Sequence, residues 1–243
     1  MSSSMDLNIQ ANGLQIDGRI LVKAASITLP ATGSCALIGR NGAGKSCLLR
    51  ELIRRGQVSL QAKGGGVDRF SWLPQAGEFP ADYTVRDFVL MGRFREHRGF
   101  PKAKDDEICG RWLDALKLTA LSERKLEQLS GGERQLVMVT RALCSDSAVI
   151  VLDEPFSNLD LENRVLLFQV LETVARERCV IYSLHGLELL AWQSGIVLAI
   201  DSSLAIRRYS NVAEIDANDL KSIFNVEIEV DGKANRRFSL RPD

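Results

Sequence analysis

The chain has 243 residues, and its 31 Lys plus Arg balance its 31 Asp plus Glu, so the formal net charge is zero. This length allows one large domain or two small ones, with a substantial buried core. The charge balance argues against nucleic acid as an obligate partner, because binding a phosphate backbone requires a basic surface excess. The five cysteines form no C-x-x-C pair and the two histidines are too few for a usual zinc site, so we expect reduced, buried or half-buried thiols.

The sequence predicts neither a secretory signal nor a membrane span. The N-terminus lacks a basic start followed by an apolar core, and the strongest uncharged apolar run, residues 148–152, has only the length of a strand. Any role of this chain in transport would therefore depend on a partner.

Short apolar segments separated by turn dipeptides come first in the chain. Residues 7–10, 15–22 and 26–30 are strand-like, with Asn-Gly and Asp-Gly turns between them. These turns predict a small antiparallel sheet, which leads into a buried strand at residues 34–38.

Residues 39–46 fit the phosphate-loop pattern G-x-x-x-x-G-K-[ST], between the strand at 34–38 and a predicted helix at 46–55. Glycines let the backbone turn so that several N–H groups face phosphate oxygens, and the helix N-terminus favours an anion. Lys45 can reach the β- and γ-phosphates, and the Ser46 hydroxyl can bind Mg²⁺. A glycine-rich turn could fit by chance, but the flanking strand and helix favour nucleotide binding. The expected nucleotide-binding residues of the loop are Gly39, Arg40, Asn41, Gly42, Ala43, Gly44, Lys45, Ser46 and Cys47.

Two strands and a helical region follow. Residues 57–63 and 67–73 are strand-like, and the glycines at 64–66 form a flexible spacer between them. Residues 79–128 show helical periodicity, which predicts an inserted helical lobe. One apolar helix face there comprises Ile108, Trp112, Leu113, Leu116 and Leu118. Five aromatic residues of this region lie close together in the sequence: Phe79, Tyr83, Phe88, Phe94 and Phe100. Most of them are expected in the core of the lobe, while a few could form an apolar docking surface for another protein.

The segment L-S-G-G-E at residues 129–133 opens a helix that runs to about Cys144, and its S-x-x-E pattern is a capping box. Residues 148–152 are apolar at every position, as expected for a parallel strand covered on both faces. Asp153 and Glu154 end this strand. An acidic turn is the plain explanation for such a pair, but the apolar strand and the phosphate loop together favour a catalytic one.

Alternating helices and strands complete the chain. Asp160 can cap a helix, and residues 179–184 form another buried strand that ends at His185. The apolar side of the capped helix comprises Val165, Leu166, Val170, Leu171 and Val174. Further strands are predicted at 195–200 and 204–209, a helix at 217–224, and a hairpin from 226–230 to 236–240.

This succession of strands and helices predicts an α/β core, in which a mostly parallel sheet is flanked by helices. Ligands bind such sheets at the carboxyl ends of the strands, where the phosphate loop, Gln75, Asp153, Glu154 and His185 all fall. Asp153 is suited to hold Mg²⁺, and Glu154 can act as the general base for a water beside the γ-phosphate. A surface position is the plainer explanation for His185 taken alone.

Six motifs in a fixed order give the chain a resemblance to ATPase subunits of the ATP-binding cassette (ABC) family, over nearly its whole length. Residues 129–133 resemble the family signature, 39–46 Walker A, and 149–154 Walker B. Gln75 matches the Q-loop glutamine, residues 157–160 resemble the D-loop, and His185 resembles the switch histidine, which implies a γ-phosphate contact.

The resemblance implies a single nucleotide-binding domain over residues 1–243, with a P-loop NTPase core and a small antiparallel β subdomain. It places a helical subdomain at about 79–128 and a C-terminal appendage at about 201–243. ATP and Mg²⁺ are the implied ligands. The implied metal ligands are Ser46, Gln75 and Asp153, and the implied catalytic residues are Glu154, His185 and Gln75.

The family likeness also implies a homodimer. Ser130, Gly131 and Gly132 would contact the nucleotide held by a second copy, so two chains would pair head to tail around two ATP molecules. Hydrolysis would remove the bridging γ-phosphate and open the pair.

The segment Y-T-V-R-D-F-V-L-M-G-R at residues 83–93 resembles a segment of subunits that serve iron-chelate, haem and cobalamin importers, as does the tail at 223–226. This implies an ATPase subunit that works with transmembrane permease subunits and a periplasmic or extracellular substrate-binding protein. It would lie peripherally at the cytoplasmic face of the inner or plasma membrane. The alternative is a soluble ABC ATPase that acts in cluster assembly, translation or repair. A nucleotide-binding regulator without turnover is disfavoured because Glu154 is present.

The chain departs from the family pattern at four places. Cys47 stands where Thr is usual, and Ile16 replaces an aromatic residue that often stacks on adenine, which would weaken base selectivity. Gly186 follows the switch histidine in place of an acidic residue. The segment between Ser46 and Gln75 is short for an importer subunit, which predicts a trimmed antiparallel lobe.

Overall fold

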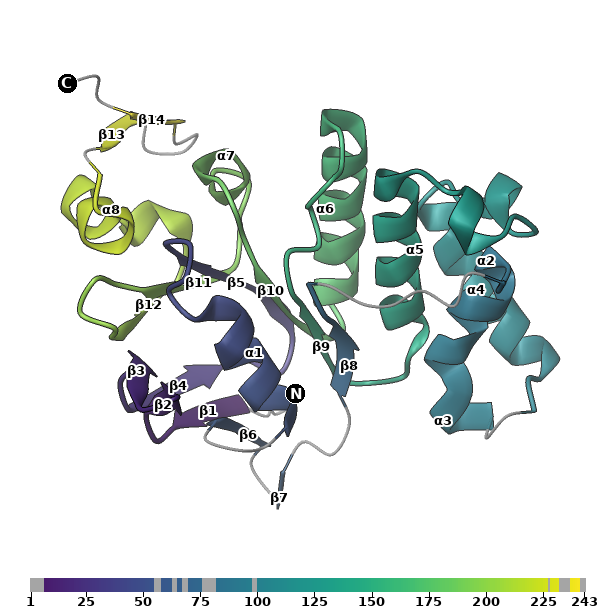
Figure 1. The fold of residues 1–243 in the computed structure, drawn as a ribbon, viewed down its shortest axis with the longest axis horizontal. Helices are drawn as coiled ribbons and strands as arrows, with labels where there is room; N and C mark the ends of the chain where they lie inside the picture. The colour runs from purple at the N-terminus through teal and green to yellow at the C-terminus, as the bar shows by residue number, and fades with distance from the viewer. Residues whose placement is uncertain are drawn as a thin grey trace.

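A six-stranded sheet forms the centre of the computed structural model, which describes residues 7–54, 58–62, 65–66, 70–75, 82–97, 100–226, 228–231 and 237–240 (Figure 1). The strands are ordered β12-β11-β5-β10-β9-β8. All neighbours are parallel except β11 and β12, which are antiparallel. Their bounds are β5 Gly33–Gly39, β8 Phe70–Leu73, β9 Val149–Leu152, β10 Cys179–Ser183, β11 Ile196–Ile200 and β12 Ile206–Tyr209. The predicted mostly parallel α/β sheet is therefore confirmed.

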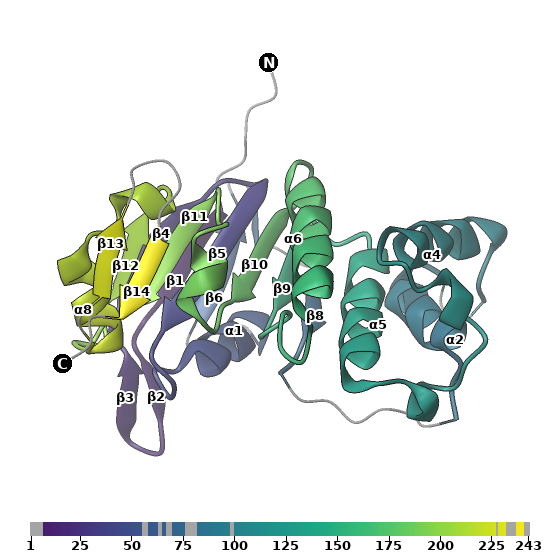
Figure 2. The ribbon, with the colours of Figure 1, turned by 90° about the horizontal axis from the view of Figure 1, so that it is seen from above.

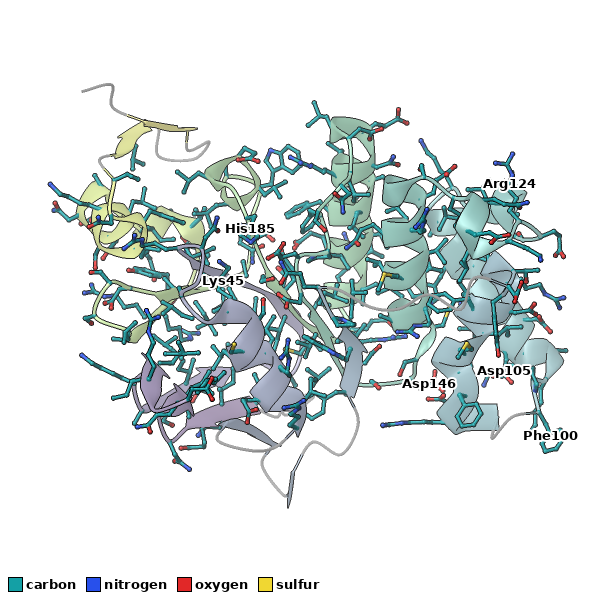
Figure 3. All side chains as sticks on the ribbon, viewed as in Figure 1. Lys45, Phe100, Asp105, Arg124, Asp146 and His185 are labelled. Atoms are coloured by element: carbon teal, nitrogen blue, oxygen red, sulfur yellow. The ribbon has the colours of Figure 1, made fainter. Side chains whose placement is uncertain are left out.

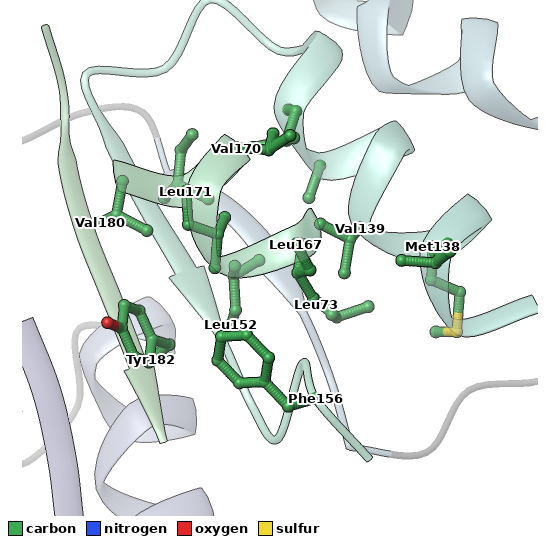
Figure 4. Packing of buried hydrophobic residues seen from close by; sticks show 14 of the residues in the cluster. Leu73, Met138, Val139, Leu152, Phe156, Leu167, Val170, Leu171, Val180 and Tyr182 are labelled. Atoms are coloured by element: carbon green, nitrogen blue, oxygen red, sulfur yellow. The ribbon is translucent and has the colours of Figure 1, made fainter. Parts of the chain in front are cut away.

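Both faces of this sheet are buried, each against a hydrophobic core of its own. Successive side chains of a strand point to opposite faces and therefore join different cores. Ile150 and Leu152 of β9 join a core with helices α5 (Gly131–Cys144) and α6 (Leu161–Ala175). Figure 4 shows this packing close by. Val149 and Val151 join a second core with α1 (Lys45–Arg54) and the antiparallel sheet. Every residue of β9 is buried, which explains its unbroken apolar sequence.

The predicted small antiparallel sheet is confirmed for residues 7–10 and 26–30, which pair in a sheet with the strand order β4-β1-β6-β7, but it is wrong for residues 15–22, which are not part of this sheet. A separate hairpin, β2–β3, reaches away from the body of the molecule in Figure 2. These strands are β1 Leu7–Ala11, β2 Leu14–Ile16, β3 Arg19–Val22, β4 Ala25–Leu29, β6 Val58–Ala62 and β7 Gly65–Gly66. The interpretation of 64–66 as a spacer is wrong for Gly65 and Gly66, because they pair with β6. The predicted strand ends at residues 57, 63 and 67 lie outside the described residues.

Helices gather on one side of the sheet, beyond α6 and next to α5 (Figure 2). They are α2 Val85–Leu90, η1 Met91–Arg93, α3 Phe94–His97, α4 Ala103–Ala115, η2 Thr119–Leu121 and η3 Leu126–Gln128. Phe88 is buried as expected, but Tyr83, Phe94 and Phe100 are exposed by 44%, 61% and 82%. The expectation that most of these aromatics lie in the core is therefore wrong for those three, and Phe79 lies outside the described residues.

Arg93 fixes the end of α2 to the rest of this helical group. Its guanidinium donates from Nε to Asp105 Oδ1 (2.8 Å) and from Nη1 to Asp146 Oδ1 (2.5 Å) and to the Cys144 carbonyl (3.1 Å). Burial by itself lowers the pKa of Arg93, but the hydrogen bonds to Asp146 and Asp105 together outweigh it, so the pKa of Arg93 is raised. The preceding Gly92 has no room for a side chain, because a Cβ would lie 2.1 Å from the Arg141 carbonyl oxygen.

The last part of the chain adds α7 Leu187–Leu190, η4 Val212–Glu214, α8 Ala217–Phe224 and the antiparallel pair β13 Ile228–Asp231 and β14 Arg237–Leu240. Asp160 caps α6 as predicted, because its side chain accepts from the Asn163 N–H. Val165 is 38% exposed, so its assignment to the apolar side of α6 is wrong. Of the helices within the described ranges, none has both the length and the apolar character to cross a bilayer. Of the five thiols, all free, four are buried and Cys47 is half-buried, as expected.

Candidate active site

The loop after β5 forms the first wall of the site. Gly42 and Gly44 have φ values of 75° and 94°, a region that glycine adopts without strain. The ammonium of Lys45 donates to the carbonyls of Gly39 (2.8 Å) and Arg40 (3.2 Å), so its charge lies over the loop. Burial lowers the pKa of Lys45, while the negative charges of Glu154 and Asp153 oppose this shift. The loop thus combines backbone N–H groups with one buried cation, which suits a bound phosphate chain.

A cavity of about 500 Å³ lies between this loop and the carboxyl ends of the parallel strands. Lys45 and His185, both labelled in Figure 3, line it from different elements, Lys45 at the start of α1 and His185 after β10. The complete lining is Leu21, Asn41, Gly42, Gly44, Lys45, Ser46, Cys47, Gln75, Glu154 and His185. A larger hollow of about 760 Å³ shares Asn41 and His185 with it. The smaller cavity is the candidate nucleotide site, because the loop cation and the Glu154 carboxylate both face it.

Glu154 is the meeting point of the predicted catalytic residues. One of its carboxylate oxygens, Oε1, accepts from Gln75 Nε2 at 2.7 Å and lies 2.6 Å from His185 Nε2. The Ser46 hydroxyl lies 3.5 Å from Gln75 Oε1, which extends this chain of contacts to the phosphate loop. The structure therefore brings Ser46, Gln75, Glu154 and His185 together, although they come from four different elements.

Strand register explains why these residues meet. Leu73 of β8 and Leu152 of β9 are paired neighbours, so Gln75 and Glu154, each two residues further, leave the sheet at the same edge. The backbone N–H of Asp153 also donates to the Leu73 carbonyl at 2.9 Å. Strand β10 is the parallel neighbour on the other side of β9, so His185, two residues after the end of β10, lies at the same edge of the sheet as Glu154.

Two residues that the sequence did not single out hold the backbone of Glu154. Its N–H donates to Ser183 Oγ at 2.7 Å, and its carbonyl accepts from Gln135 Nε2 at 3.1 Å. The Ser183 hydroxyl also donates to Asp153 Oδ1 at 2.7 Å. The available signal for Ser183 was a polar residue at the end of the apolar strand β10.

The donor set suits Mg²⁺, which binds oxygen ligands and keeps several waters. The Ser46 hydroxyl and the Gln75 amide oxygen lie at the cavity, and Asp153 is a buried carboxylate, 2% exposed, directly before Glu154. No group of three or more His, Cys, Asp or Glu suited to a metal occurs within the described part of the chain.

Similarity to known proteins agrees with a nucleotide site of this kind. The family model described as "ABC transporter" matches residues 22–157, which is more than half of the chain. The chain belongs to the ABC transporter family.

Two relatives of the chain are import ATP-binding proteins. It is 28% identical to the iron(3+)-hydroxamate import ATP-binding protein FhuC of Bacillus subtilis, over 98% of this chain and 95% of the relative. It is 31% identical to the petrobactin import ATP-binding protein FatE of Bacillus anthracis, over 87% and 90%. A solved structure described as an inward-facing conformation of a putative metal-chelate type ABC transporter has a TM-score of 0.81 with 26% identity, and the match covers 98% of both chains.

The ABC signature lies apart from this cavity. Ser130 caps α5, because its Oγ accepts from the Glu133 N–H (3.2 Å) while Glu133 Oε2 accepts from the Ser130 N–H (2.8 Å). Hydrogen bonding of the Glu133 carboxylate by the backbone N–H of Ser130, and next by the Ser130 side chain, lowers the pKa of Glu133. Gly132 lies against the carbonyl of Asn158, and no signature residue is among those that line the cavity. Within one copy, the structure does not bring Ser130, Gly131 and Gly132 to the phosphate loop.

Two apolar side chains also belong to the lining of the cavity. Leu21 lines the cavity beside Gly44, and Cys47 lines it from α1. Ile16, at the end of β2, is 41% exposed. Leu21 and Cys47 therefore give the cavity apolar contact without an aromatic face, and Ile16 is not among its lining residues.

Proposed function

We propose that the chain is the ATP-hydrolysing subunit of a membrane ABC importer of the iron-chelate, haem or cobalamin type. The observation that carries the chemistry is the Glu154 carboxylate, held between Gln75 and His185 at the phosphate-loop cavity. The importer assignment is supported by the similarity to the import ATP-binding proteins FhuC and FatE and to the metal-chelate type transporter structure. We propose residues 1–243 as one nucleotide-binding domain, with a helical subdomain at about 79–128 and an appendage at about 201–243.

In the proposed reaction, a water oxygen attacks the γ-phosphorus of ATP and a proton of that water moves to Glu154. The bond between the γ-phosphorus and the β–γ bridging oxygen breaks, which gives ADP and inorganic phosphate. Gln75 and His185, which both contact Glu154 Oε1, orient the Glu154 carboxylate. In the proposed complex His185 also contacts the γ-phosphate. Mg²⁺, when bound, neutralises charge on the phosphates. Ser46, Gln75 and Asp153 would hold it.

A second copy of the chain completes the proposed site. The N–H groups of Gly131 and Gly132 lie in the first turn of α5, before its first intrahelical donor, and can bind an anion, yet Ser130 does not line the cavity of its own chain. A head-to-tail pair would bring Ser130, Gly131 and Gly132 of each copy onto the ATP of the other.

The exposed aromatic side chains of the helical group support a permease partner. Tyr83, Phe94 and Phe100 expose large apolar groups on the segment that resembles importer subunits and just after it. We propose that they contact transmembrane permease subunits at the cytoplasmic face of the membrane, in a system that includes a substrate-binding protein. Co-purification with a multi-span membrane protein would support this proposal, whereas its absence under mild detergent would favour a soluble ABC ATPase.

Glu154→Gln tests the chemistry. We expect hydrolysis to fall by about 10²–10⁴-fold with ATP still bound, because the variant removes the base but not the phosphate contacts. Sedimentation in MgATP should then show a dimer, since uncut ATP continues to bridge the two copies. Lys45→Ala, as the matched control, should lose ATP binding and remain monomeric. An active Glu154→Gln, or one that stays monomeric in MgATP, would refute the proposal.

A further inference from the structure

We propose that Ser183 is a positioning residue for both carboxylates of the candidate active site, acting through a single hydroxyl group. It fixes the Asp153 side chain on one side and the Glu154 backbone on the other. This inference rests on the proposed function, because it assigns Ser183 a role through the residues proposed to hold Mg²⁺ and to accept the proton.

The backbone at Glu154 needs external support. Its φ is 51°, in the left-handed region that residues other than glycine rarely adopt. Such a conformation persists where the surrounding structure determines it, and it is concentrated at functional sites. At Glu154 it turns the chain sharply at the end of β9, so that the carboxylate reaches Gln75 and His185.

The hydroxyl of Ser183 is suited to hold both residues because the chemistry of its two partners determines which bond it donates and which it accepts. A serine hydroxyl has one proton to donate, and an ionised carboxylate can only accept. The proton is therefore directed to Asp153 Oδ1 at 2.7 Å, which leaves a lone pair of the same oxygen to accept the Glu154 N–H at 2.7 Å. Ser183 is only 1% exposed, so water does not compete for either bond.

The backbone carbonyl of Glu154 has more hydrogen-bond partners than its N–H. Gln135 Nε2 donates to the carbonyls of Glu154 and Pro155, both at 3.1 Å. The hydroxyl and the N–H of Ser157 also donate to the Glu154 carbonyl, at 2.9 and 3.1 Å. Because this carbonyl has three donors, loss of Gln135 should matter less than loss of the Ser183 hydroxyl.

The test compares Ser183→Val with Ser183→Thr, which have nearly the same shape but differ in the hydroxyl. Partners that orient metal ligands typically contribute about 10–100-fold to activity or metal affinity. We expect Ser183→Val to lower kcat and to raise the Mg²⁺ concentration for half-maximal activity within that range, with KM for ATP nearly unchanged. Ser183→Thr should restore both values towards wild type. Mg²⁺-dependent ADP binding, measured by calorimetry, should follow the same order.

Ser71→Ala is the matched control. Its hydroxyl is also buried and donates to the Ala142 carbonyl at 2.6 Å, away from Glu154. A purely structural loss would lower the amount of active protein without moving the Mg²⁺ midpoint, so Ser71→Ala should leave that midpoint at the wild-type value. Equal kcat and equal Mg²⁺ midpoints for Ser183→Val and Ser183→Thr would overturn the inference. An inactive Glu154→Gln together with a fully active Ser183→Val would refute the role of Ser183 alone, whereas an active Glu154→Gln would refute the proposed base.

Discussion

Replacing Arg93 with Ala should destabilise the protein strongly, because Arg93 is a buried cation with two carboxylate partners. The Arg93 and Asp105 side chains are only 4% and 6% exposed, with 2.8 Å between Nε and Oδ1. Removing one partner of a buried pair leaves the other charge uncompensated, at a cost of about 3–5 kcal/mol. For a protein of this size we expect the melting temperature to fall by about 6–20 °C.

Arg86→Ala provides the control within the same helical group. Arg86 also pairs with an aspartate, Asp106 at 2.7 Å, but the two side chains are 52% and 39% exposed. Exposed pairs contribute about 0.2–1 kcal/mol, so this variant should melt within a few degrees of wild type. Circular dichroism melts of both variants decide the matter. Equal melting temperatures for Arg93→Ala and Arg86→Ala would show that burial does not set the strength of the Arg93 interactions.

Three further outcomes follow from the same structure. The pKa of Glu133 lies below its ordinary value of 4.5, so its capping contribution is complete above pH 4.5 and is lost as pH falls through the lower folded-state value. The stability gap between wild type and Glu133→Ala, measured by urea unfolding across this range, should therefore shrink towards acid; a constant gap would contradict it. Leu152→Ala, at a fully buried position, should cost about 2–5 kcal/mol in the same assay. Phe94→Ser with Phe100→Ser should leave ATP hydrolysis by the chain unchanged but reduce co-purification with a permease, and undiminished recovery would exclude these residues from that contact.

The phosphate loop and the strand before it could be predicted because their signals are local. Three spaced glycines, a lysine and a helix start specify the backbone of residues 39–46 without reference to the rest of the chain. The same holds for the capping box of Ser130 and Glu133, whose two bonds join residues three positions apart. The unbroken apolar sequence of β9 was also enough to predict burial on both faces.

Exposure in the helical group could not be obtained in this way. Phe88 and Phe94 lie on one short stretch of chain, yet Phe88 is 3% exposed and Phe94 61% exposed. The difference depends on where α2 and η1 meet α5, and therefore on contacts such as that of Arg93 with Asp146, 53 positions later.

What the sequence by itself determined is the set of local devices: the loop that can bind phosphate, the cap of α5 and the apolar strands. What only the tertiary structure decided is how the phosphate loop and the residues that follow β8, β9 and β10 meet at one edge of the sheet. Gln75 meets Glu154 across 79 positions, and Ser183 meets Glu154 across 29, because β8, β9 and β10 are neighbours in a parallel sheet. Strand order and register arise from the burial of two whole faces at once, and no short segment of the chain contains that information.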